Sequence, residues 1–172
     1  AEAGEAKGRV VVHSSSARVS PVALEAAVWL ARAFQSEIES LYVENTELIA
    51  IASHPVAREI SHAGRVSRGG TGLAVIEREF RFASEEFHRA MAACAHAGEV
   101  AVRQRVVRDD PVRALSAVCA DCGPWNAVAL AEPFTSPSCP SIKVLLETVR
   151  DATGLLVVGP RAQRTRGPIV IA

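Results

Sequence analysis

Residues 9–21 read RVVVHSSSARVSP, and this stretch predicts the fold of the chain. Three consecutive valines between polar residues are typical of a strand that is buried on both faces. Ser20 is a preferred helix N-cap, and Pro21 suits the first helical turn because its missing N–H would have no partner there. We therefore expect a strand over 9–13, a serine loop, and a helix through Phe34.

The same alternation of short apolar runs and helical segments continues along the chain. Regularly alternating strands and helices favour an α/β protein, here a Rossmann-like open parallel sheet of five strands with helices on both faces. In such sheets ligands bind beyond the C-terminal ends of the strands. The further strands are expected at 37–43, 100–107, 125–131 and 155–158, with an extra one at 169–171, and the further helices at 72–97, 111–122 and 141–152.

Two helices carry apolar side chains at spacings of three and four residues, which is the pattern of a helix with one apolar side. The long helix is expected to lie on the sheet, and a helix–helix contact, within the chain or across a dimer, is the alternative. The apolar side of the first helix is predicted to consist of Val22, Ala26, Trp29, Leu30, Ala33 and Phe34, and that of the long helix of Leu73, Ile76, Phe80, Ala83, Phe87, Ala90 and Cys94.

The segment 44–72 interrupts the alternation and is expected to be an insert within a domain that covers 1–160. It holds one short apolar run at 48–52, predicted as a helix, and is locally basic through Arg58, Arg65 and Arg68. A connection of this length in a compact domain is expected to be functional or mobile.

Composition excludes several classes of protein. Lys and Arg together number 19, as do Asp and Glu, so the charge balance argues against a nucleic-acid-binding protein. The hydrophobic share of 49% argues against disorder, and no uncharged apolar run is long enough to cross a membrane. The four cysteines form no disulfide framework. We expect a cytoplasmic protein that contacts neither nucleic acid nor membrane.

Several segments together resemble the universal stress protein (UspA-like) family. They are SPVALEAAVWLARAF at 20–34, LYV at 41–43 and VVRDDPVRALSAVCADCGPWNAVALAEP at 106–133, within a resemblance that covers about Arg9 to Gly159. The resemblance implies a divergent member with a five-stranded parallel sheet of order 3-2-1-4-5. It also implies a homodimer through the last strand, and ATP as the ligand that many members bind.

The ATP signature of that family is altered in this chain. Family members carry a Gly-x-x-Gly motif, nine further residues, and then Gly-Ser or Gly-Thr after the fourth strand, whereas no glycine occurs between Pro124 and Thr153 here. Glycine lets backbone N–H groups approach phosphates, and Glu132 would repel them. The resemblance therefore implies a non-catalytic stress-response or regulatory domain with a degenerate ATP site and no cofactor, acting through dimerisation and an unknown protein partner.

The alternative function is a binding module for a nucleotide, such as ATP or AMP, or for another small anionic metabolite at the strand ends. A purely structural role, in which the hydroxyls cap helices and turns and the histidine bonds to a loop, stays open. No catalytic or metal-binding residue is predicted. The Cys119-x-x-Cys122 pair falls near a helix C-terminus, where the helix dipole disfavours a reactive thiolate. The candidate ligand-binding residues are His13, Ser14, Ser15, Ser16, Val43, Glu44, Thr135, Ser136, Ser138 and Ser141.

The segment 161–172 is expected to be a basic link followed by an extra strand. Gly167-Pro168-Ile169-Val170-Ile171 resembles the opening strand in style. We interpret it either as a strand at a dimer edge or as the first strand of a truncated second copy.

Overall fold

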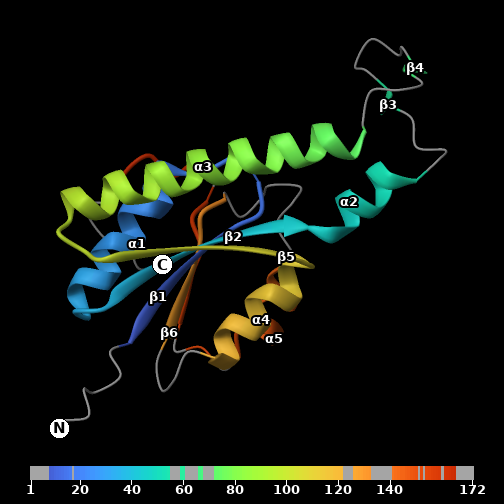
Figure 1. The fold of residues 1–172 in the computed structure, drawn as a ribbon. Coiled ribbons are helices and arrows are strands. Elements are labelled where there is room, and N and C mark those ends of the chain that lie inside the picture. The colour runs from blue at the N-terminus through green and yellow to red at the C-terminus, as the bar shows by residue number, and fades with distance from the viewer. Residues whose placement is uncertain are drawn as a thin grey trace, which may run out of the picture.

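The computed structural model describes residues 8–16, 18–54, 59–60, 66–67, 72–121, 126–132, 141–150, 152, 154–159 and 161–165. These residues contain one sheet of five parallel strands in the order β5-β2-β1-β6-β7, which is 3-2-1-4-5 when its strands alone are numbered (Figure 1). The predicted fold class is confirmed. The strands are β1 (Arg9–Ser14), β2 (Glu37–Asn45), β5 (Val102–Asp109), β6 (Asn126–Leu130) and β7 (Gly154–Leu156).

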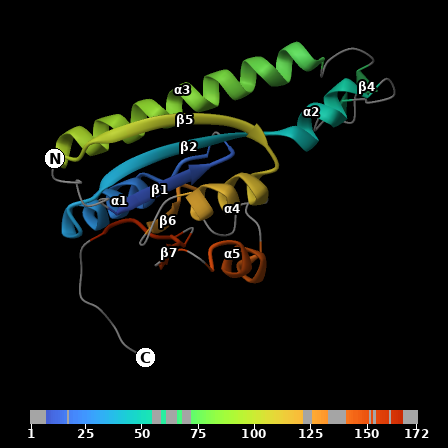
Figure 2. The ribbon, with the colours of Figure 1, turned by 60° about the horizontal axis from the view of Figure 1, so that its bottom comes forward.

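Helices cover both faces of the sheet. One face packs against α1 and α3, and α4 and α5 lie on the other (Figure 2). Val10 and Val12 of β1 face the first layer while Val11 faces the second, which is why the three consecutive valines are all buried. The helices are α1 (Pro21–Ala33), α2 (Thr46–Ser53), α3 (Leu73–Ala97), α4 (Pro111–Asp121) and α5 (Ile142–Thr148).

The start of α1 confirms the capping prediction. Ser20 is in extended conformation, and its side chain accepts a hydrogen bond from the Ala23 N–H, with Pro21 directly after it. The backbone N–H of Ser20 also donates to the Ala131 carbonyl at 2.7 Å, so the loop after β1 is tied to the end of β6.

The apolar side predicted for α1 is not its buried side. Trp29 is 62% exposed and Phe34 50% exposed. The buried residues of α1 are smaller on average, and Leu24 and Val28 are the largest of them. These buried residues are Ala23, Leu24, Ala27, Val28 and Ala31.

Helix α3 confirms the prediction of a helix on a sheet, and it also contacts α1 and α2 within the chain. Phe80, Ala83 and Phe87 of the predicted seam are buried, whereas Leu73 at the start of the helix is 39% exposed. Figure 1 shows the reason, since the first turns of α3 extend past the end of the sheet beside α2.

The insert contains structure that the sequence pattern only partly indicated. The short helix expected at 48–52 is α2, which begins directly after β2. A two-residue pairing of β3 (Glu59–Ile60) with β4 (Val66–Ser67) was not expected. Arg58, Arg65 and Arg68 lie outside the described residues.

Some expectations differ at element ends or cannot be compared. Helix α5 ends at Thr148 rather than 152, and β7 covers 154–156 rather than 155–158. The extra strand expected at 169–171 lies outside the described residues. Among the helices of the described ranges, none has the length and apolar character that a membrane crossing needs.

Candidate functional site

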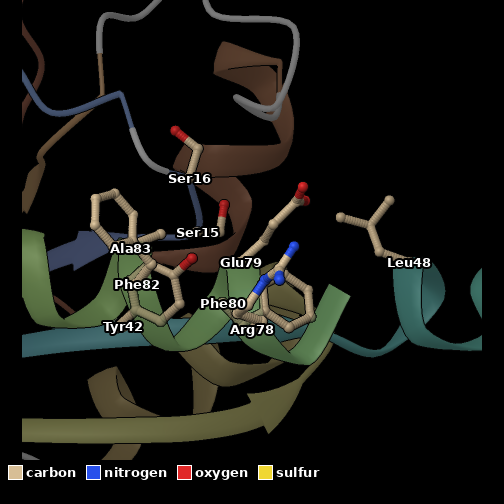
Figure 3. Close-up of a pocket in the computed structure, with 9 residues that line it drawn as sticks. All are labelled: Ser15, Ser16, Tyr42, Leu48, Arg78, Glu79, Phe80, Phe82 and Ala83. Carbon is tan, nitrogen blue, oxygen red and sulfur yellow. The ribbon is translucent and has the colours of Figure 1, made fainter. Parts of the chain in front are cut away.

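A hollow of about 500 Å³ opens at the C-terminal ends of β1 and β2, and we call it the strand-end pocket. Figure 3 shows Ser15 and Ser16 of the loop after β1 above α3, with Leu48 of α2 to one side. Small-molecule sites measure about 300–1,000 Å³ and commonly lie at strand ends in α/β sheets. The lining residues are Ser15, Ser16, Tyr42, Leu48, Arg78, Glu79, Phe80, Phe82 and Ala83.

The wall of the strand-end pocket is mostly apolar. Phe80 is buried, whereas Phe82 is largely exposed at the opening. Tyr42 at the base packs its ring against Phe87, with ring centroids 6.3 Å apart. Burial raises the pKa of the Tyr42 phenol, and the carboxylates of Glu132 and Glu44 raise it further. The phenol therefore stays neutral and can donate a hydrogen bond.

A buried carboxylate stands at the polar edge of the pocket. Glu132 follows β6 and is 4% exposed. Its Oε1 accepts a hydrogen bond from the Ser15 backbone N–H at 2.8 Å and another from the Ser15 hydroxyl at 3.1 Å. The neighbouring Ala131 N–H donates to the His13 carbonyl at 2.9 Å, which fixes the position of Glu132. The backbone N–H and the hydroxyl of Ser15 could both bind an anionic ligand, but both already donate to the Glu132 carboxylate.

The other hydroxyls of the serine loop form hydrogen bonds within that loop. The Ser14 hydroxyl donates to the Ser16 carbonyl at 3.1 Å, and the Ser16 hydroxyl accepts from the Arg18 N–H at 3.1 Å. Ser14 is fully buried. The loop is thus a hydrogen-bonded turn, of which Ser15 and Ser16 line the pocket.

His13 lies on the sheet face that carries α4 and does not line the strand-end pocket. It is 4% exposed, and burial lowers its pKa to about 4. The Glu132 charge and a hydrogen bond to the backbone of Pro111 oppose that shift without reversing it. At neutral pH the imidazole is therefore uncharged and supplies no positive charge for an anionic ligand.

Of the remaining candidate residues, those that the structure describes do not line the strand-end pocket. Val43 is fully buried on the α4 side. Glu44 accepts a hydrogen bond from Arg108 at 2.8 Å and lines a separate charged hollow between α3 and β5. Ser141 caps α5 through the Val144 N–H at 3.4 Å. Thr135, Ser136 and Ser138 lie outside the described residues.

Sequence reasoning missed the α3 side of the pocket. Phe82 stands two residues after Phe80, so it falls off the apolar seam, and an off-seam aromatic residue was the available signal. Tyr42 was identified from the sequence only as part of an expected strand and not as a pocket residue. Glu132 was recognised as a negative charge, but its bond to Ser15 across 117 positions was not foreseen.

The Cys119-x-x-Cys122 pair falls only partly within the described residues. Cys119 is buried against α5 and the sheet, as expected for a core thiol, and Cys122 lies outside the described residues. Within the part of the chain that the structure describes, no three His, Cys, Asp or Glu side chains are grouped as metal ligands would be.

No protein-family model and no curated protein matches the sequence. Solved structures do match the fold. The universal stress protein UspA from Lactobacillus plantarum superposes with a TM-score of 0.57 at 15% identity, over 88% of this chain and 97% of that chain. A protein of the universal stress protein family from Burkholderia pseudomallei gives a TM-score of 0.52 at 17% identity, over 90% of this chain and 98% of that chain.

A third match is a universal stress protein in complex with cAMP, with a TM-score of 0.52, 17% identity and coverage of 90% of this chain and 98% of that chain. The predicted likeness to UspA-type proteins is confirmed at the level of structure. Because the superpositions cover nearly the whole length of each chain, the chain has the universal stress protein fold.

Proposed function

We propose that the chain is a divergent, non-catalytic regulatory domain of the universal stress protein type. Its strand-end pocket binds a small molecule with an aromatic or apolar body, and its ATP site is degenerate. The observation that carries this proposal is the Glu132 carboxylate on the two donors of Ser15, beside a pocket walled by phenylalanine and leucine side chains.

The Glu132 carboxylate disfavours a phosphate beside Ser15, although the lining of the pocket also includes Arg78 together with Glu79. A phosphate there would stand next to the Glu132 carboxylate in a partly desolvated setting, where repulsion between like charges is strong. His13 is neutral and turned to the other sheet face, so it does not offset that repulsion. The apolar wall supports an uncharged ring or chain as the bound group.

The serine and histidine of the β1 end are not arranged for nucleophilic catalysis. The Ser15 hydroxyl donates to a carboxylate rather than to an imidazole, and His13 is hydrogen-bonded to Pro111 on the opposite face of β1. A serine nucleophile needs a base within hydrogen-bond reach that can take its proton at neutral pH. This geometry supports binding rather than turnover.

We further propose that the domain acts in the cytoplasm in stress adaptation, as a homodimer that contacts a protein partner. The sheet ends in a short edge strand, β7, which supports association through that side. The fold neighbour in complex with cAMP supports a small-molecule signal as the input.

The proposal predicts that a ligand with fewer phosphate groups binds the strand-end pocket more tightly. Protein freed of nucleotide is melted with adenosine, AMP and Mg-ATP at equal concentrations. We expect adenosine to raise Tm more than AMP, and AMP more than ATP. A ligand at 100 times its Kd adds about 2.7 kcal/mol, a shift of several degrees for this chain length. A larger shift with ATP, or none with any of the three, would contradict the proposal.

A single variant isolates the role of the carboxylate. Glu132→Gln keeps the shape and an acceptor for the Ser15 N–H but removes the charge. We expect AMP to bind about tenfold tighter, a gain of about 1.4 kcal/mol, while adenosine binding stays the same. Glu147→Gln, an exposed change on α5, is the matched control and should alter neither affinity. Unchanged AMP binding in Glu132→Gln would show that this charge does not exclude phosphate.

A further inference from the structure

A second hollow, of about 600 Å³, runs along the outer side of α1, and we call it the α1 groove. One wall is the apolar stripe of α1 that the sequence spacing identified. The other wall is the chain from the end of β7 into the link at 161–165. The residues of the α1 wall are Val22, Ala26, Trp29, Leu30, Ala33 and Phe34.

Several large apolar side chains of the α1 groove are exposed. Trp29 is 62% exposed and Phe34 50% exposed on the same helix side, and Val157 of the opposite wall is 37% exposed. A contiguous apolar patch of this kind marks a surface that another group covers.

The path of the chain brings a candidate to this groove. Arg164 and Thr165 line it, and the Thr165 hydroxyl donates a hydrogen bond to the Glu25 carboxylate of α1 at 3.4 Å. The end of the described link is therefore held against α1. Ile169 follows Thr165 by four residues, which span at most about 14 Å. The groove runs about 18 Å along the helix from Val22 to Phe34, so Ile169 can reach much of it.

The sequence beyond Thr165 contains apolar side chains of the kind that could cover the apolar groove. Ile169, Val170 and Ile171 are consecutive β-branched residues, which favour an extended backbone and bury well. Pro168 before them suits the start of an edge segment, because it has no N–H to pair. A short tether gives such a segment an effective concentration in the millimolar range, which favours docking within one chain over docking between chains.

We propose that residues 169–171 of the same chain dock in the α1 groove and cover Trp29. This intrachain docking site is separate from the strand-end pocket and does not depend on the proposed ligand. It assigns the apolar segment of the tail to its own domain rather than to a dimer edge.

Trp29 reports the docking directly. In a Trp125→Phe background the fluorescence comes from Trp29 alone, since the chain has two tryptophans. Deletion of 166–172 is expected to shift the Trp29 emission to longer wavelength and to increase its quenching by acrylamide. Ile169→Ser/Ile171→Ser keeps the chain length and should have the same effect. A synthetic peptide of residues 166–172 added to the deletion variant should restore the shielding.

Controls separate docking from unfolding and from dimerisation. Leu146→Ser removes a large exposed side chain from α5, away from the groove, and should leave Trp29 quenching unchanged. Far-UV circular dichroism confirms that each variant is folded. Equal quenching in the deletion variant and the parent would overturn the proposal. Shielding that falls on dilution, together with the mass of a dimer at high concentration, would also overturn it in favour of a second copy.

Discussion

The two sides of helix α1 differ in a way that reverses the usual expectation. The side against the sheet consists mainly of alanines, with Leu24 and Val28, and is almost fully buried. The outer side carries the larger residues Trp29, Leu30 and Phe34. Both sides are apolar, so hydrophobicity does not decide which one enters the core. The side with the smaller side chains on average is the one that enters the core, where close packing limits the volume that fits. The large apolar residues on the exposed side then indicate a surface that binds another segment.

The strongest test of this comparison uses one residue type on both sides of the helix. Leu24→Ala empties a fully buried site and is expected to lower the free energy of unfolding by about 2–5 kcal/mol. Leu30→Ala, on the partly exposed outer side, should cost less than half as much. Urea unfolding measures both, provided that the m-values agree with the parent. Equal losses for the two leucines would show that the outer side is as much a part of the core as the inner side.

A second test adds volume instead of removing it. Ala27 is fully buried between α1 and the sheet, so Ala27→Leu should overpack the core and cost about 1–3 kcal/mol. Ala33→Leu makes the same change on the exposed side, where substitutions usually stay within about 0.5 kcal/mol. Thermal unfolding of the pair shows the contrast. If Ala27→Leu were as stable as the parent, the close approach of α1 to the sheet would not explain the alanines.

The fold could be predicted from sequence because its signals are local. Three buried valines, Ser20-Pro21 at a helix start and the regular alternation of elements each depend on neighbouring residues. The residues of the strand-end pocket are a different case. Ser15 and Ser16 follow from the rule that ligands bind at strand ends. Tyr42 and Phe82 do not, because their meeting depends on how far α3 extends past the sheet.

The exposure of the α1 stripe and the Glu132 bond could not be predicted for the same reason. A stripe of apolar residues indicates a helix with a buried side but not which of two apolar sides is buried. A carboxylate after one strand indicates local charge but not its partner 117 residues earlier. Both depend on the packing of distant segments, which a single sequence does not specify.

The smallest expected effect tests the contact between α1 and the end of α3. A Cβ at Gly98 would lie 2.3 Å from Cγ1 of Val28, which belongs to the buried side of α1. The φ angle of Gly98 is −93°, so the backbone itself accepts alanine. Overpacking should cost about 1–3 kcal/mol, and the lower entropy of the unfolded chain should return about 0.4–1 kcal/mol of it. We therefore expect Gly98→Ala to destabilise the protein by about 1 kcal/mol.

The double variant Val28→Ala/Gly98→Ala shows whether that cost comes from the inner side of α1. Val28→Ala alone loses buried surface, but it also removes the atom that the new Cβ would meet. Residues in contact show coupling energies of about 0.5–3 kcal/mol, so the loss for the double variant should be smaller than the sum of the single losses. Strictly additive losses would mean that Val28 moves aside without cost. The inner side of α1 would then be less tightly packed than its alanines suggest, and the contrast with the outer side would weaken accordingly.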